Sequence, residues 1–342
     1  MKDLACPIPL RHATVQLAHG GGGRIMRELL ETLVMPAFAG PAQEARRDAA
    51  VLPLAGGLAF TTDTFVVNPR FFPGGNIGEL AVYGTVNDLA MVGARPLYLS
   101  CGLVLEEGYP LAELARVLAA MRAAADRCGV AIATGDTKVV DKGKVDGLFI
   151  NTAGIGLAPG ADIGPWSLQP GDAVLVSGDV GRHGVAVMSM RENLGFESPV
   201  ESDCAPVHGL VADLLEGGIE VRCLRDPTRG GIASVLHEIA GDAGLGIEVA
   251  ERDIPVLDAV ASACEILGLD PLYVACEGRM VAFVPSAQAD RALEILRSRP
   301  EGRGAARIGH VHDGPTAVTL RTRMGTQRIL DLFSGEQLPR IC

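Results

Sequence analysis

Hydrophobic and polar positions repeat along the chain with two periods, one typical of helices and one typical of strands. Apolar residues at helical spacing predict helices over 24–34, 77–92, 111–127, 183–193, 207–215, 230–240, 258–267 and 288–297. Short apolar runs predict strands near 15–18, 58–61, 66–67, 97–105, 130–134, 147–156, 173–176, 220–224, 247–249, 306–311 and 317–330, with a hairpin across 272–284. Strands and helices are therefore expected to be mixed throughout the chain.

A segment rich in glycine and proline divides this pattern into two halves. Residues 159–170 include a lone tryptophan, Trp166, and we expect a boundary there between domains over 16–160 and 170–333. Two domains also suit a chain of 342 residues. Residues 1–15 are expected to form an extension, and residues 334–342, which lack periodicity, to form a mobile tail.

Composition indicates a globular chain and argues against two kinds of partner. Hydrophobic residues make up 48%, charged residues 21% and aromatic residues only 4%, so the core must be aliphatic. The formal net charge of −11 repels phosphate backbones and anionic lipid, which argues against nucleic-acid and membrane binding. A single nucleotide in a local pocket is not excluded. No stretch is long and apolar enough to predict a membrane span.

Cysteine usage indicates a reducing compartment. The eight cysteines have irregular spacings and include no C-x-x-C, which favours free thiols over a disulfide framework or a zinc site. The first residues make a poor signal peptide because Pro7 and Pro9 break the apolar run. We therefore expect a cytoplasmic protein.

A run of glycines before the first predicted helix is a candidate anion site. Its residues are His19, Gly20, Gly21, Gly22 and Gly23. Glycines let the backbone approach a ligand closely, and a helix start offers unpaired N–H groups that suit a phosphate. The run matches neither a Walker A loop nor G-x-G-x-x-G. A flexible turn is an equally good interpretation.

A repeated Thr-x-Asp-Thr tetrad is a candidate metal site. It occurs at 61–64 and 134–137, each time after an apolar strand, so we expect Asp63 and Asp136 at neighbouring strand ends. Mg²⁺ prefers such hard oxygen ligands together with substrate phosphates. Two ordinary Asx turns remain the alternative.

Two further acids are candidates for the same cluster. Asp88 shares a helix face with Leu80, Gly84 and Met91, and a carboxylate on a buried face needs a cation or hydrogen-bond donors. Asp48 is a fourth candidate, although a surface turn would explain it equally well.

The second half carries two more candidate residues. Residues 225–231 lead into a helix that Thr228 could cap, with Arg229 facing a phosphate. A simple capping turn explains the same residues. Glu277 lies in the predicted hairpin, where it is either a turn carboxylate or a base beside a cleft.

The last residue, Cys342, is unusual because exposed thiols oxidise. A nucleophile on a mobile arm can be loaded at one place and processed at another. An accidental terminal cysteine is the alternative.

Together these stretches resemble the HypE family of hydrogenase maturation factors, in the superfamily of aminoimidazole ribonucleotide synthetase and selenophosphate synthetase. The likeness begins near Gln16 and departs mainly in the extra N-terminal residues and in Arg47 before Asp48. The Pro339-Arg340-Ile341-Cys342 ending is the most specific match. The other matching stretches are 17–23, 71–78, 87–90, 134–140, 149–154 and 225–231.

The resemblance implies an α+β, two-domain, synthetase-like fold with mixed sheets and packed helices. It also implies a homodimer whose N-terminal domains bind ATP. In such a protein HypF transfers a carbamoyl group to the terminal thiol, and ATP drives its dehydration from a thiocarboxamide to a thiocyanate. The cyano group then passes to the HypC–HypD complex and becomes an iron ligand of [NiFe]-hydrogenase.

This chemistry assigns roles to the candidate residues, because the amide oxygen must be phosphorylated before it can leave. Cys342 carries the group, and Lys138 is the candidate cation, although it could be an ordinary solvated lysine. Glu277 is the first choice of base by family position, with Lys138 second. Mg²⁺ is assigned to Asp48, Asp63, Asp88 and Asp136. Contacts to ATP are assigned to His19, Gly20, Gly21, Gly22, Gly23, Asp63, Thr64, Asp88, Asp136, Thr137, Asn151 and Arg229.

Two other functions fit the same residues. One is an ATP-dependent small-molecule synthetase of the same superfamily with an idle tail. The other is a thiol carrier or scaffold that does no chemistry of its own.

Overall fold

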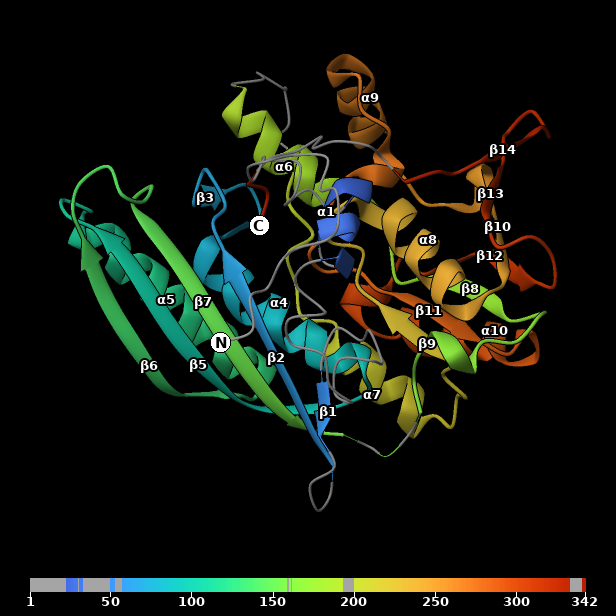
Figure 1. Ribbon diagram of the computed structural model, residues 1–342, viewed down its shortest axis with the longest axis horizontal. Helices are drawn as coiled ribbons and strands as arrows, with labels where there is room; N and C mark the ends of the chain where they lie inside the picture. The colour runs from blue at the N-terminus through green and yellow to red at the C-terminus, as the bar shows by residue number, and fades with distance from the viewer. Residues whose placement is uncertain are drawn as a thin grey trace, which may run out of the picture.

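Two β-sheets, each covered by helices, make up the fold (Figure 1). The computed structural model describes residues 23–29, 31–32, 50–52, 57–158, 160, 162–192, 200–332 and 340–342. Both sheets combine parallel and antiparallel pairs, which confirms the expected α+β fold. Residues 1–15 and the predicted strand over 15–18 lie outside the described residues. No described helix is long and apolar enough to cross a bilayer.

The first sheet has the strand order β1-β2-β7-β5-β6. Its strands are β1 (Ala50–Leu52), β2 (Leu58–Phe65), β5 (Arg95–Glu106), β6 (Ala131–Val140) and β7 (Leu148–Leu157). The other elements of this half are α1 (Arg24–Leu29), the small β3 (Phe71–Phe72) and β4 (Gly75–Asn76) pair, α4 (Ile77–Met91) and α5 (Leu111–Cys128). Helices α4 and α5 cover one face of this sheet. The other face, turned toward the viewer in Figure 1, carries none of the helices that the structure describes, and we call it the helix-free face.

The second sheet has the order β14-β13-β10-β12-β8-β11-β9. Its strands are β8 (Ala173–Val176), β9 (Cys223–Arg225), β10 (Gly246–Ala250), β11 (Val281–Val284), β12 (Ala306–His312), β13 (Val318–Arg321) and β14 (Gln327–Ile329). Its helices are α6 (Arg182–Arg191), α7 (His208–Glu216), α8 (Gly231–Ala243), α9 (Asp258–Leu267) and α10 (Ala289–Arg297). Short 3₁₀ turns lie at Pro165–Ser167, Glu251–Asp253, Pro271–Tyr273, Ser286–Gln288 and Pro300–Gly302.

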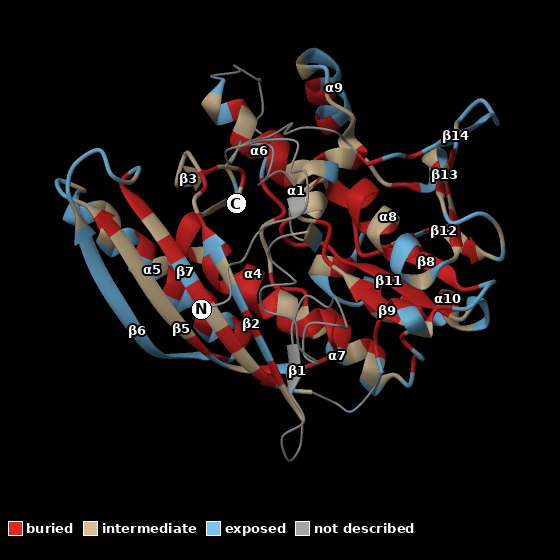
Figure 2. Ribbon diagram, viewed as in Figure 1, coloured by how far each residue is buried: buried red, intermediate tan, exposed pale blue. Residues whose placement is uncertain are grey.

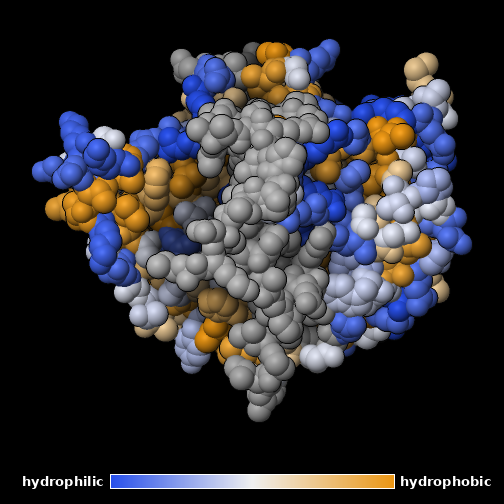
Figure 3. All heavy atoms as spheres, in the orientation of Figure 1, coloured by the Kyte–Doolittle hydropathy of each residue, from blue (hydrophilic) through white to orange (hydrophobic). Residues whose placement is uncertain are grey.

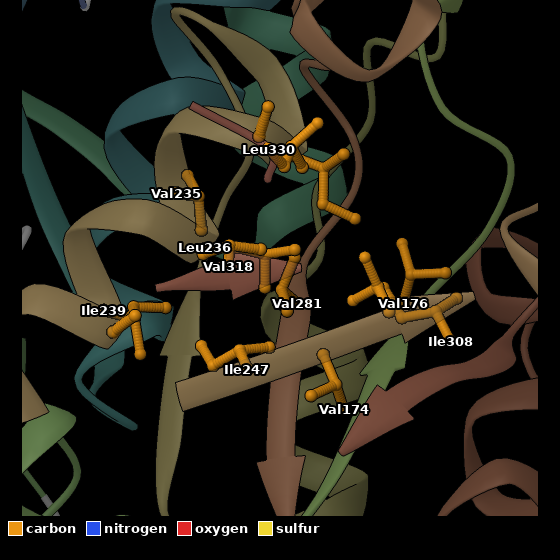
Figure 4. Close-up of a cluster of buried hydrophobic side chains, with 14 of the residues drawn as sticks. Val174, Val176, Val235, Leu236, Ile239, Ile247, Val281, Ile308, Val318 and Leu330 are labelled. Atoms are coloured by element: carbon orange, nitrogen blue, oxygen red, sulfur yellow. The ribbon is translucent and has the colours of Figure 1, made fainter. Parts of the chain in front are cut away.

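Aliphatic side chains fill the space between each sheet and its helices. In the second half, Val174 and Val176 of β8 pack with Leu236 and Ile239 of α8 (Figure 4). Figure 2 shows how burial varies across the fold: α4 is deeply buried, and β6 is exposed at the edge of its sheet. A core without large aromatic clusters is what the low aromatic content predicts.

Helix α4 joins the two halves. Asn76 caps it, because its side-chain oxygen accepts the N–H groups of Gly78 and Glu79 at 2.9 and 3.1 Å. Near the other end, Asn87 donates to the carbonyl of Ala205 and accepts the N–H of Val207. Its amide is thus satisfied on both sides while it is buried. The segment before α7 is therefore fixed to the first half.

Three local predictions are wrong. The first is the short strand near 66–67, where the structure has no strand. Both Thr-x-Asp-Thr tetrads lie inside strands, in β2 and β6, because pairing with neighbouring strands continues through them. The expected hairpin over 272–284 is absent from these residues. Instead, Asp270 caps a 3₁₀ turn, and β11 pairs with β8 and β9 rather than with the segment preceding it.

Gly154→Ala in β7 should destabilise the chain, because an added Cβ would lie 2.8 Å from Thr85 and 3.0 Å from both Leu89 and Leu99. We expect the free energy of unfolding to fall by about 1–3 kcal/mol in denaturant titrations. Gly102→Ala in β5 is the matched control, since its Cβ would meet only ordinary contacts at 3.6 Å and beyond. Equal stabilities of the two variants would contradict this packing.

Candidate active site

The last three residues, Arg340–Cys342, lie against the segment that follows β2. The N–H of Val66 donates to the Cys342 carbonyl at 3.0 Å, and that of Asn68 donates to the Arg340 carbonyl at 3.3 Å. The chain end therefore binds as an added strand would. Ile341 is buried in the hydrophobic core of the first half. The structure thus places the partly buried thiol against this core, and the mobility of residues 334–342 stays a prediction.

Arg340 turns the chain end into the site. It is the one described non-glycine residue with a positive φ, at 55°. Its guanidinium donates to the Val66 carbonyl and to Asp146 Oδ2 at 2.7 Å. Arg191 of α6 donates to the Arg340 carbonyl at 2.9 Å. These contacts hold a backbone conformation that costs energy outside glycine.

The sulfur of Cys342 lies against Arg229. The guanidinium Nε donates to Sγ at 3.3 Å. Burial raises the pKa of the Cys342 thiol to about 11, and the nearby carboxyl groups of Glu277 and Asp63 add to the rise while Arg229 opposes it. The docked thiol is therefore protonated at neutral pH. The structure places Arg229 on the sulfur, whereas the sequence assigned it to ATP.

Glu277 lies beside this sulfur in a wholly buried segment before β11. Burial raises the pKa of its carboxyl well above the usual range, and the charges of Asp226, Asp63 and Asp203 raise it further. Its N–H donates to Asp203 Oδ1 at 3.2 Å. Its Oε1 has no hydrogen-bond partner among the described residues. A buried carboxyl with a free oxygen suits proton transfer.

Asp63 and Asp88 lie between β2 and α4. An added Cβ at Gly84 of α4 would be 3.9 Å from Asp63 Oδ2, and one turn further along, Asp88 accepts a hydrogen bond from Thr61 at 2.8 Å. Burial raises the pKa of Asp63, although Arg229 opposes this shift. Two of the four predicted metal ligands thus share one side of the sheet.

Asp136 does not join them within one chain. The register places Asp63, Thr152, Cys101 and Gly135 in one row across β2, β7, β5 and β6. Three strand spacings separate Asp63 from Gly135, about 14 Å. Asp136 follows Gly135 and so points to the opposite face. The expectation that the two tetrads bring their carboxylates together is therefore wrong for a single chain.

The helix-free face carries a second polar row. Its residues, from β2 to β6, are Thr64, Asn151, Gly102 and Asp136. The Asn151 amide donates to Thr64 Oγ1 at 2.8 Å. Lys138 is paired with Asp136, and its proximity lowers the pKa of that exposed carboxyl. Lys138 is thus separated from the docked thiol of its own chain.

Other predicted residues lie elsewhere. Thr137 lines a groove of about 760 Å³ between α5 and β6, and Cys342 is not among the residues that line it. Gly23 immediately precedes α1, while His19, Gly20, Gly21, Gly22 and Asp48 lie outside the described residues. In the part of the chain that the structure describes, no three His, Cys, Asp or Glu side chains are grouped closely enough to hold a metal ion.

Sequence reasoning missed the residues that contact the tail or support those that do. They are Asp146, His183, Arg191, Ser202 and Asp203. None forms a motif, because each contacts a backbone group or a partner far away in the chain. What these residues share is their location around the docked chain end, which only the structure shows.

Two family models cover most of the chain. The N-terminal domain of AIR synthase related proteins matches residues 46–158, and the C-terminal domain matches residues 169–321. A protein named carbamoyl dehydratase HypE from Azotobacter vinelandii is 50% identical over 98% of this chain and 99% of its own length. One of the same name from Escherichia coli is 48% identical over 96% of this chain and 99% of its own.

Solved structures agree with these relatives. A HypE chain described in a HypE–HypF complex is 48% identical and has a TM-score of 0.86, covering 89% of this chain and 99% of that chain. HypE in complex with ATP is 46% identical with a TM-score of 0.82, covering 96% of this chain and 100% of that chain. A ThiL enzyme at 17% identity, with a TM-score of 0.69, shares the fold.

Alkylation of Cys342 by iodoacetamide in the intact chain should keep accelerating from about pH 8 to about pH 11. Docking raises the pKa of the thiol, so docking is strongest below the ordinary thiol pKa and weakens as pH rises toward the docked value. Mass spectrometry of the C-terminal peptide gives the rate, with Cys342→Ser as the control. A profile that levels off near the ordinary value of about 8.5 would contradict a buried thiol.

Proposed function

The chain belongs to the HypE family of carbamoyl dehydratases, within the AIR synthase related proteins, and from this premise we propose how it acts. It uses ATP to dehydrate a carbamoyl group that Cys342 carries as a thiocarboxamide. The product is a thiocyanate, which supplies the cyanide ligand of [NiFe]-hydrogenase iron. The observation that carries the proposal is the terminal sulfur docked on Arg229 beside Glu277.

The reaction needs the amide oxygen to leave. Transfer of the terminal phosphoryl group of ATP to that oxygen forms a C–O–P linkage and ADP. The C–O bond then breaks, phosphate departs, and the nitrogen loses both protons as the C≡N bond forms. Oxygen leaves as phosphate rather than as oxide, and the sulfur stays bonded to carbon throughout.

Glu277 is the proposed base for a nitrogen proton. A carboxyl whose pKa is raised binds a proton more strongly than an ordinary carboxylate, so it accepts one more readily when ionised. Arg229 opposes that rise in pKa and so favours the ionised form. The same guanidinium donates to the sulfur and fixes the reacting group against the carboxyl.

Asp63 and Asp88 are the proposed Mg²⁺ ligands that one chain brings together, with Asp48 from outside the described residues. Carboxylate oxygens fit this hard cation. Bound there, the ion would neutralise charge on the phosphate oxygens of ATP. Asp136 and Lys138 lie on the helix-free face, and we assign them to nucleotide contacts at an interface between two copies.

The helix-free face is the proposed homodimer interface. Phe60, Ile155 and Tyr98 form a row on it, and Phe60, Tyr98 and Leu157 are 42%, 50% and 41% exposed. Figure 3 shows hydrophobic side chains gathered on this side of the molecule, over the first sheet. Exposed apolar patches of this kind mark protein interfaces. Burying them would bring the polar rows of two copies together.

One proposed partner has support among the relatives: a similar chain forms a HypE–HypF complex, and we propose HypF as the donor of the carbamoyl group. We further propose HypC–HypD as the acceptor of the cyano group and the cytoplasm as the location. A synthetase with an idle tail would not need its last residue hydrogen-bonded inside the site. A passive carrier would not need Glu277 there.

Glu277→Gln should slow dehydration of a preloaded tail by about 10²–10⁴-fold, because the amide cannot accept the nitrogen proton. Carbamoylation of Cys342 should continue. Mass spectrometry of the C-terminal peptide follows both steps, and Glu248→Gln, on the distant second sheet, is the control. Full dehydration by Glu277→Gln would remove Glu277 from this role.

Tyr98→Asp should convert a dimer to a monomer, because it places a charge in the apolar row of the interface. Light scattering after size-exclusion chromatography measures the change. Met324→Asp, at a residue 94% exposed on the second half, should leave the dimer intact. A Tyr98→Asp chain that stays dimeric would place the interface elsewhere.

A further inference from the structure

The buried histidine that opens α6 has no role in the proposed chemistry. His183 is fully buried and packs edge-on against Phe72, with ring centroids 5.2 Å apart. Its Nε2 lies 2.8 Å from the carbonyl oxygen of Ile341, and its Nδ1 lies 2.8 Å from Ser202 Oγ. It therefore contacts the docked tail one residue before the reacting cysteine.

The hydrogen bonds fix the state of this ring. A carbonyl only accepts, so Nε2 carries the proton that it shares with Ile341. Burial lowers the pKa of His183, so the ring is neutral and Nδ1 accepts the Ser202 hydroxyl proton. Ser202 Oγ in turn accepts the N–H of Cys204 at 3.0 Å. Each polar atom of the ring has one partner.

The next residue along the chain connects this contact to the proposed base. Asp203 Oδ1 accepts the Glu277 N–H at 3.2 Å, and its other oxygen lies 3.8 Å from Arg279. The backbone at Gly278 packs so tightly on the Asp203 carbonyl that a Cβ there would be 1.9 Å from it. Ser202 is itself held by the Pro73 carbonyl through its N–H at 2.8 Å.

We propose that His183 is a positioning residue of the dehydration: it holds the Ile341 carbonyl and, through Ser202 and Asp203, places the Cys342 sulfur in one rigid frame with Glu277. The inference rests on the proposed function for its catalytic consequence. His183 touches no reacting atom. Its effect is to keep the tail docked long enough, and in the right register, for the group on sulfur to meet the base.

Two substitutions at this residue separate the hydrogen bond from the bulk of the ring. His183→Leu fills similar space without a donor, whereas His183→Gln keeps an N–H at the same number of bonds from the backbone. In the intact chain, iodoacetamide should alkylate Cys342 about tenfold faster in His183→Leu and within about twofold of wild type in His183→Gln. The C-terminal peptide is measured by mass spectrometry.

A preloaded tail supplies the second readout. His183→Leu should dehydrate it at least about tenfold more slowly, while its loading by the carbamoyltransferase does not slow. His183→Gln should restore most of the dehydration rate. General misfolding would slow loading and dehydration together. If His183→Leu does not fold, Ser202→Ala decides, with a smaller rise in alkylation of about threefold.

Three results would overturn the proposal. The first is an unchanged alkylation rate in a folded His183→Leu chain, or in Ser202→Ala if His183→Leu does not fold. The second is faster alkylation with an unchanged dehydration rate, and the third is failure of His183→Gln to restore either rate. Alkylation needs no carbamoyl chemistry. If wild type did not dehydrate its tail, the proposed function would fail while alkylation still tested the docking contact.

Discussion

The hydrogen bond between Arg229 and the sulfur of Cys342 is the interaction on which the rest of the site depends. It holds the side chain of the last of 342 residues in a partly buried place, near the carboxyl groups of Glu277 and Asp63. Burying a thiol among acids suppresses its ionisation, so the docked sulfur is a poor nucleophile. We therefore expect the thiol to be loaded with the tail outside the site and processed with the tail docked.

Both halves of the fold contribute to this arrangement. The first half offers a strand end, at Val66 and Asn68, to which the tail adds its own backbone. The second half supplies Arg229, Glu277 and the residues of α6. Helix α4 links the two through the paired amide of Asn87. The site therefore depends on the packing of the halves, and neither half contains it alone.

Periodicity predicted the long elements because their hydrophobic faces are set locally. Helix α4 was expected over 77–92 and lies at Ile77–Met91. Asp63 and Glu277 lie near the terminal thiol, and their roles there stay predictions. The tetrads were misplaced because polar residues can continue a strand when they point to an open face or lie at a sheet edge. Asp136 and Asp63 were expected together because the sequence shows the repeated motif. Only the strand register shows that the two carboxylates point to opposite faces of the sheet. His183 and Asp203 could not be predicted, since they act on backbone groups that carry no signal in the sequence.

The central claim is that the carbonyl oxygen of the group on Cys342 is phosphorylated and leaves as phosphate. A tail loaded with a carbamoyl group carrying heavy oxygen in its carbonyl, incubated with ATP, tests this most directly. The account predicts that the label appears in inorganic phosphate in step with loss of one water from the C-terminal peptide. Release of the heavy oxygen into water would contradict this claim, as would its retention on the tail after ATP has been converted to ADP.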